Sequence, residues 1–135
     1  EAAMEAALLN QRLSRAQDRV GEVEEALDQL LATLDGMEGD DAEALREAAR
    51  ELQDAVDGEV DFEPATSQRR GLYALQSSWD APTTLELTAM ERMAAALTDV
   101  ETEVNALLAG PVADFRRQVE GTDLVLFPTF DPVGR

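Results

Sequence analysis

The sequence predicts an all-α protein, an antiparallel up-down four-helix bundle with long first and fourth helices and an extended C-terminal tail. Its 135 residues are 44% hydrophobic but only 4% aromatic, so burial depends on Leu, Val, Ala and Met, which favours helices over a sandwich or barrel. Apolar residues recur at spacings of three and four over long stretches. The length suits one domain with one core, which covers residues 1–135.

The first predicted helix, residues 2–35, carries a heptad seam. Its apolar residues alternate spacings of four and three: Leu9, Leu13, Ala16, Val20, Val23, Leu27, Leu30 and Leu34. Such a seam can join a second copy as a coiled coil, which would make a homodimer, or it can pack against other helices of its own chain. The intramolecular bundle is favoured because each later helix carries an apolar stripe that needs covering.

Two shorter helices are predicted over residues 41–57 and 67–79. The second helix begins where Asp40 and Glu43 stand at the spacing of a helix cap and its third residue. Its apolar face consists of Leu45, Ala49, Leu52 and Val56. Pro64 and Thr66 are predicted to close a loop before the third helix. The apolar face of the third helix consists of Leu72, Leu75 and Trp79.

The stretch SSWDAPTTLELT joins the third and fourth helices and holds the only Trp. Thr83 and Glu86 have the spacing of a capping box, and Asp80 and Pro82 prevent the third helix from continuing. We interpret the stretch as a structural corner that Trp79 fills. The alternative is that Trp79 and Asp80 form the edge of a ligand site.

The fourth predicted helix, residues 84–120, is the longest. Its inward residues are Leu87, Met90, Met93, Leu97, Val100, Val104 and Leu107. Gly110 and Pro111 interrupt the pattern, so a kink or a restart is expected there, with Val112, Phe115 and Val119 continuing the apolar face.

The tail, residues 122–135, is apolar and rich in Pro, which is typical of extended chain. Leu124, Leu126, Phe127 and Phe130 are its predicted interaction residues. An apolar cluster of this density is expected to be docked, because in water it would form an exposed patch that invites association. The tail is predicted to fold back on its own bundle, and the alternative is contact with another domain or another chain.

The charge balance excludes several function classes. The chain has 29 acidic and 11 basic residues, all of them Arg, and a net charge of −18. A field of this sign repels nucleic-acid backbones and anionic membranes. No stretch approaches the roughly 18–20 apolar residues that span a bilayer, so no membrane insertion is expected. The chain begins inside an amphipathic pattern, and we expect it to be a fragment of a larger protein.

The residue types also limit the chemistry. The chain has no His, Cys or Lys, which excludes most nucleophilic triads, zinc sites and Schiff-base chemistry. Carboxylates remain, and Asp57, Glu59, Asp61 and Glu63 alternate in a way that could offer oxygens to Ca²⁺ from one loop, although the spacing is not that of an EF-hand. A small acidic Ca²⁺-binding or carboxylate-dependent hydrolytic domain is therefore the alternative to a non-enzymatic module. No cofactor is predicted.

Three segments resemble a known family. SRAQDRVGEVEEALDQL, GLYALQSSWDAPTTLELTAMERM and VETEVNALLAGPVADFRRQVEGTDLVLFP together are similar to the helical domain that follows the β-propeller in microbial sortilin-like, BNR-repeat proteins, which are often described as glycosyl hydrolases. The resemblance implies export from the cytoplasm, a preceding propeller, and a helical element with an accessory or interaction role. Its expected partner is that propeller or another protein. The resemblance assigns no catalytic residue to this segment.

Overall fold

A computed structural model describes residues 2–76 and 84–134 of the chain. The helices within this part are α1 (Ala2–Asp35), α2 (Asp40–Glu59), α3 (Glu63–Gln76), α4 (Thr84–Leu107), the π-helical turn η1 (Leu108–Val112) and α5 (Ala113–Glu120). An extended tail follows α5. The described residues form helices, turns and irregular chain but no strand, so the predicted all-α class is confirmed.

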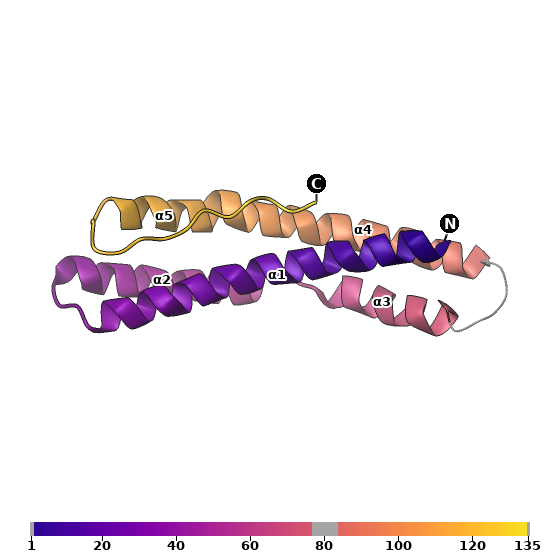
Figure 1. The fold of residues 1–135 in the computed structure, drawn as a ribbon, viewed down its shortest axis with the longest axis horizontal. Coiled ribbons are helices and arrows are strands. Elements are labelled where there is room, and N and C mark those ends of the chain that lie inside the picture. Colours follow the sequence, from indigo (N-terminus) through magenta and orange to yellow (C-terminus); the bar gives the residue numbers. More distant parts are fainter. Residues whose placement is uncertain (1, 77–83, 135) are drawn as a thin grey trace.

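The helices form an elongated molecule along α1 (Figure 1). α2 and α3 follow one another along one side of α1 and run opposite to it, while α4, η1 and α5 run in the same direction as α1 (Figure 1). α1 packs against α2 and α4, and α3 packs against α4. Because α2 and α3 share one side of the molecule, the predicted side-by-side packing of four antiparallel helices is not established by this arrangement.

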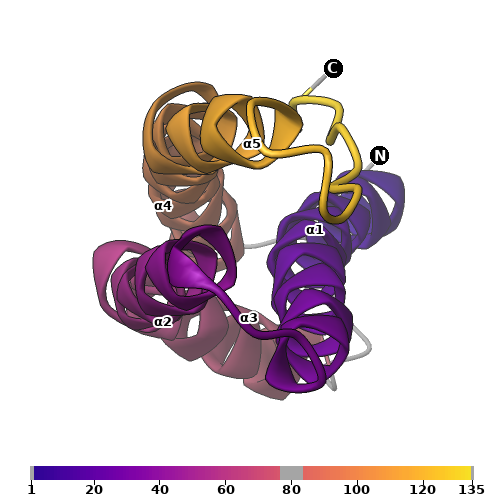
Figure 2. The same cartoon turned by 90° about the vertical axis from the view of Figure 1, so that its left-hand side faces the viewer.

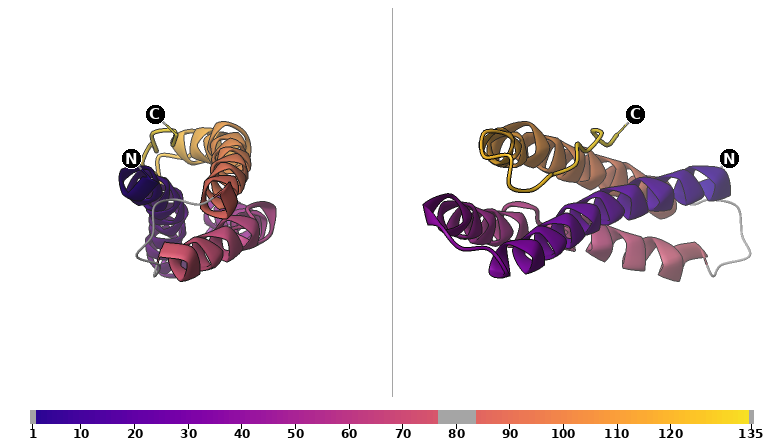
Figure 3. Two further views of the ribbon diagram at one scale, coloured as in Figure 1. Left: turned by 90° about the vertical axis from the view of Figure 1, so that its right-hand side faces the viewer. Right: turned by 60° about the vertical axis from the view of Figure 1, so that its left-hand side comes forward.

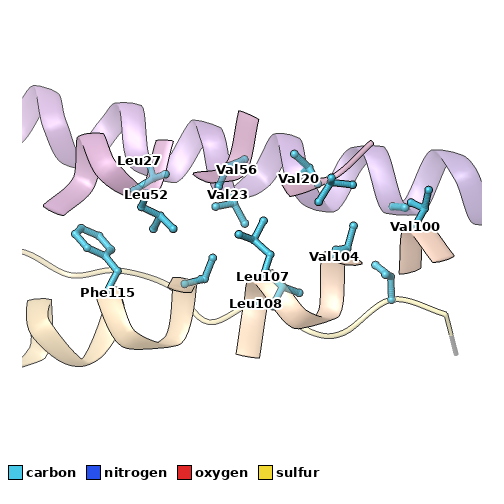
Figure 4. Packing of buried hydrophobic residues seen from close by; sticks show 14 of the residues in the cluster. Val20, Val23, Leu27, Leu52, Val56, Val100, Val104, Leu107, Leu108 and Phe115 are labelled. Carbon is cyan, nitrogen blue, oxygen red and sulfur yellow. The ribbon is translucent and has the colours of Figure 1, made fainter. Parts of the chain in front are cut away.

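The core is built from the predicted apolar faces. All the seam residues of α1, from Leu9 to Leu34, are buried, and so are the predicted residues of α2. Figure 4 shows Val23 of α1, Val56 of α2 and Leu107 of α4 facing one another. The heptad stripe of α1 is therefore covered by other helices of the same chain, as the intramolecular alternative of the sequence analysis predicts.

The start of α2 differs from the prediction. Asp40 is already the first helical residue, and Gly39 occupies the cap position with φ 120° and no side-chain cap hydrogen bond. The carbonyl oxygen of Gly39 accepts the N–H of Glu43 at 3.1 Å. Glycine suits this position because a side chain would be strained at positive φ. Asp40 and Asp41 then lie in the first helical turn, where negative charge is favourable.

α3 begins four residues before its predicted start, at Glu63 instead of residue 67. Pro64 lies in the first turn of the helix, where its missing N–H removes no hydrogen bond. The side chain of Asp61 accepts the N–H of Glu63 at 3.0 Å, and this local turn starts the helix. Placing Pro64 in a loop was therefore wrong, because proline is compatible with the first turn.

The expected interruption at Pro111 takes the form of a π-helical turn. η1 contains Gly110 and Pro111 and joins α4 to α5 without a loop. In an α-helix the ring of Pro111 would clash with the carbonyl of Leu107, and the wider turn of a π-helix relieves such a clash. Val112, Phe115 and Val119 are buried beyond it, as the sequence predicts.

Among residues 2–76 and 84–134, no helix combines the length and the apolar character required to cross a bilayer.

Candidate functional site

An ion pair between α1 and α4 holds the one buried charged residue in the described part of the chain, Glu101, which is 8% exposed. Its carboxylate accepts two hydrogen bonds from Arg12 of α1, at 2.5 Å from Nη2 to Oε1 and at 3.2 Å from Nε to Oε2. Hydrogen bonding to Glu101 raises the pKa of Arg12 above its ordinary value, although burial acts in the opposite direction. Each charge satisfies the other, so the pair is a bridge between the two helices.

The end of the tail is anchored beside this ion pair. The side chain of Asn105, one turn after Glu101, pairs with the backbone of Val133: Nδ2 donates to the carbonyl oxygen at 2.9 Å, and Oδ1 accepts from the N–H at 2.8 Å. Gly134 follows with φ 95°. A Cβ atom added to Gly134 would lie 3.2 Å from Cδ of Glu101. The tail backbone therefore lies against the Glu101 carboxylate at a position that favours glycine.

The predicted interaction residues of the tail separate into two groups. The ring of Phe127 contacts Phe115 of α5 edge to face, with centroids 5.0 Å apart, and contacts Phe130 with centroids 5.7 Å apart. Phe127 is 8% exposed, and Phe130 packs against the core. Leu126 is 95% exposed, and Leu124 is also exposed. The tail folds back through its aromatic side chains and leaves its two leucines at the surface.

An apolar groove lies between the N-terminal halves of α1 and α4. Its volume is about 480 Å³, which falls within the roughly 300–1,000 Å³ typical of ligand pockets. Its lining residues are Glu5, Leu8, Leu9, Arg12, Leu87, Met90, Glu91 and Ala94. Leu8 and Leu87 are 53% and 47% exposed. The predicted inward position of Leu87 is therefore wrong, because seven-residue spacing places it with Ala94 and Glu101, on the flank of the buried stripe.

The groove and the tail occupy two halves of one surface between α1 and α4–α5. We call this surface the seam, and it is distinct from the buried heptad stripe of α1. On a helix, residues separated by multiples of seven share a face. Arg12 of the groove thus shares a face with Ala26, which lines a hollow against the tail. On α4, Ala94 of the groove shares a face with Glu101, against which Gly134 lies. Figures 2 and 3 show the tail running along this seam and ending partway along α1.

The predicted oxygen ligands whose side chains are described, Asp57, Asp61 and Glu63, do not form a cation site. Asp61 accepts the backbone N–H of Glu63, and Glu63 pairs with Arg70 at 2.9 Å. Asp57 lies in a separate hollow between α1 and α2, and the side chain of Glu59 is not described. Within the described ranges, no group of three or more acidic residues is placed to hold a metal ion.

The corner predicted between the third and fourth helices lies mostly outside the described residues. Trp79, Asp80, Pro82 and Thr83 lie outside the described residues, and so does the side chain of Glu86. The capping box and the ligand-edge alternative therefore stay predictions.

The sequence analysis did not predict the surface between α1 and α4, which Leu8, Glu101 and Asn105 help to define. Leu8 was one indication of this surface in the sequence, because it is an apolar residue next to Leu9 but outside the heptad pattern. Glu101 and Asn105 follow the buried Val100 and Val104, so they lie at the edge of the apolar stripe. A polar residue repeated at that edge one turn apart is compatible with an interhelical or tail contact, but the sequence does not name the partner.

Comparison with known proteins identifies no relative. No family model matches the chain, and no curated protein or solved structure matches it significantly.

Proposed function

We propose that this chain is a non-enzymatic helical interaction module, which packs on an upstream β-propeller of the same protein or on another protein. The sequence resemblance supports the propeller as the partner. In this proposal the four principal helices act as one bundle, in which α1 and α4 carry the binding seam and α2 and α3 support it from the other side.

The observation that carries the proposal is the apolar groove in the open half of the seam. Leu8 and Leu87 are about half exposed there, above the buried Leu9 and Met90. Contiguous apolar surface of this kind marks interaction sites more often than scattered single residues do. The tail covers the other half of the same seam, so this surface is able to hold an apolar segment.

The acidic residues of the groove do not favour hydrolysis. Glycoside hydrolysis needs two carboxyl groups across a cleft, one of them in apolar surroundings that raise its pKa. Glu5 and Glu91 border the groove, and both are exposed to solvent. The buried Glu101 is held by Arg12. These placements support a binding role over a catalytic one.

Cysteine labelling tests the proposal, because the chain contains no Cys. The variant Leu8→Cys is produced with and without the proposed upstream propeller, and its reaction with a maleimide is timed. We expect the upstream domain to protect Leu8→Cys and to leave the matched variant Glu47→Cys, on the exposed face of α2, unchanged. Equal labelling of Leu8→Cys in both forms, together with no detectable binding of the upstream domain, would refute packing on the upstream propeller.

A further inference from the structure

We infer that the open half of the seam binds an amphipathic helix with an apolar face flanked on both sides by Lys or Arg. This inference rests on the proposed function and takes its second alternative, another protein, as the partner, because a β-propeller is built from strands. Three features of the described residues support it: the apolar floor of the groove, the acids on its two sides, and the tail that fills the other half of the seam.

The apolar floor of the groove favours a partner that inserts apolar side chains. Leu9 and Met90 are buried beneath the groove, while Leu8 and Leu87 expose about half of their surface on its two sides. A partner that covers these two leucines removes apolar surface from water at about 25 cal/mol per Å². Apolar side chains at helical spacing are the usual anchors for a groove between two helices.

The acidic residues on the two sides of the groove favour a partner with basic residues beside its apolar face. Glu5 of α1 and Glu91 of α4 line the groove from opposite sides, and both are exposed. The basic residue in the lining is Arg12, whose guanidinium is held by Glu101. The exposed charged residues in the groove lining are therefore both acidic, and the chain as a whole carries a net charge of −18.

The two acidic sides also favour a helix over a strand. An amphipathic helix presents polar residues on both sides of its apolar stripe, so basic residues can reach Glu5 and Glu91 at the same time. An extended segment points successive side chains to opposite faces, which does not place charges along both edges of one apolar face.

The same charges argue against other occupants. A second copy carries the same net charge of −18, so like charges would meet across the contact. The tail of the chain itself is held elsewhere, because Asn105 fixes Val133 beside the Arg12–Glu101 pair. A basic partner is the occupant whose charge complements this surface.

A labelled peptide tests the inference on the full chain. The probe is a peptide of about 16 residues, or roughly four helical turns, composed of Leu and Lys so that Leu forms one helical face. Its binding is followed by fluorescence anisotropy at physiological salt. One control peptide has the same composition with the Leu face scrambled, and a second has Glu in place of Lys. We expect the probe to bind and both controls to bind at least about ten-fold more weakly, which is roughly 1.4 kcal/mol.

Variants locate the binding. Leu8→Ser and Leu87→Ser are expected to weaken the probe about ten-fold each, and the double variant Glu5→Gln/Glu91→Gln is expected to weaken it and to reduce its salt dependence. Leu126→Ser removes the most exposed leucine of the tail, 95% exposed, and is expected to leave binding unchanged. Circular dichroism melts confirm that each variant is folded.

The following results would overturn the inference. Equal weakening by Leu126→Ser, or none by Leu8→Ser and Leu87→Ser, would show non-specific attraction to an acidic surface. A dimer in sedimentation that Leu8→Ser dissociates would assign the groove to a second copy. Absence of peptide binding, combined with protection of Leu8→Cys by the upstream domain, would leave the proposed function in place and reject the basic helix. Absence of both would reject the basic helix and the upstream propeller as partners.

Discussion

At the scale of single residues, Gly134 holds the tail in a conformation that other residues adopt at a cost. With φ 95° and Glu101 beside it, Gly134→Ala adds about 1–2 kcal/mol of backbone strain and a tight contact with the carboxylate. We expect the amide of Val133, which is bonded to Asn105, to exchange with solvent about ten-fold faster. Hydrogen exchange by NMR measures this rate.

Gly121→Ala is the matched control for this experiment. Gly121 has φ −73°, and a Cβ added there would meet its nearest atom at 3.5 Å, an ordinary contact. The exchange rate of Val133 should not change in this variant. An unchanged rate in Gly134→Ala would mean that the tail end is not held as described.

Glu101→Gln tests the ion pair at the same scale. It leaves Arg12 without its charged partner inside the seam, so we expect the free energy of unfolding to fall by about 1–3 kcal/mol. Urea denaturation measures the loss, and Glu22→Gln, which breaks the exposed pair with Arg19, should cost less than about 1 kcal/mol. Because the pKa of Arg12 is raised, the contribution of its charge is complete below the ordinary pKa of arginine. It is lost only as the pH rises through the raised value.

At the scale of the elements, the tail offers two neighbouring residues with opposite roles. Phe127 is 8% exposed and packs on Phe115, whereas Leu126 is 95% exposed. Phe127→Ala is expected to cost about 3 kcal/mol and Leu126→Ala to stay within about 0.5 kcal/mol of the parent. Thermal or urea unfolding compares them. Equal effects would contradict the burial described for the tail.

The elements also show what sequence patterns can predict. The heptad seam of α1 and the apolar faces of α2 and α5 were predicted correctly, because burial on one face imposes a period that is visible in the chain. The start of α3 was misplaced because Pro64 fits a loop and a first helical turn equally well. The pairing of Asn105 with Val133 joins residues 28 apart, and no local pattern encodes such a contact.

At the scale of the whole molecule, a net charge of −18 should make stability depend on salt. Added salt shortens the screening length from about 30 Å at 0.01 M to about 3 Å at 1 M, so self-repulsion weakens and Tm should rise. Each kcal/mol gained corresponds to roughly 3–5 °C for a domain of this size. Melts in NaCl measure the rise, and a constant Tm would mean that local pairing already neutralises the surface.

Calcium chloride at matched ionic strength is the control. Screening alone gives the same Tm in both salts, and that is the expected result. A further rise with calcium would instead favour the Ca²⁺-binding alternative, with Asp57 and Asp61 as the first positions to substitute.

The whole molecule also shows why the groove was not predicted. It depends on where the tail ends along α1, and Leu87 carries the same apolar signal in the sequence as the buried Met90 and Met93. Leu87 lies on the flank of the buried stripe, and whether a flank position is covered depends on how α1 and α4 are rotated about their axes, which a single amphipathic pattern does not determine.

The length of α1 also affects how the protein moves in solution. Its 34 residues extend about 51 Å at 1.5 Å per residue, whereas a compact chain of this size has a radius of gyration of about 14 Å. A rod of this length and about 20 Å in width, which is two packed helices, has a radius of gyration of about 16 Å. Small-angle scattering should give the larger value. In gel filtration, friction along the rod should make a 14.7 kDa monomer elute like a heavier globular protein, so its mass is correctly read from light scattering.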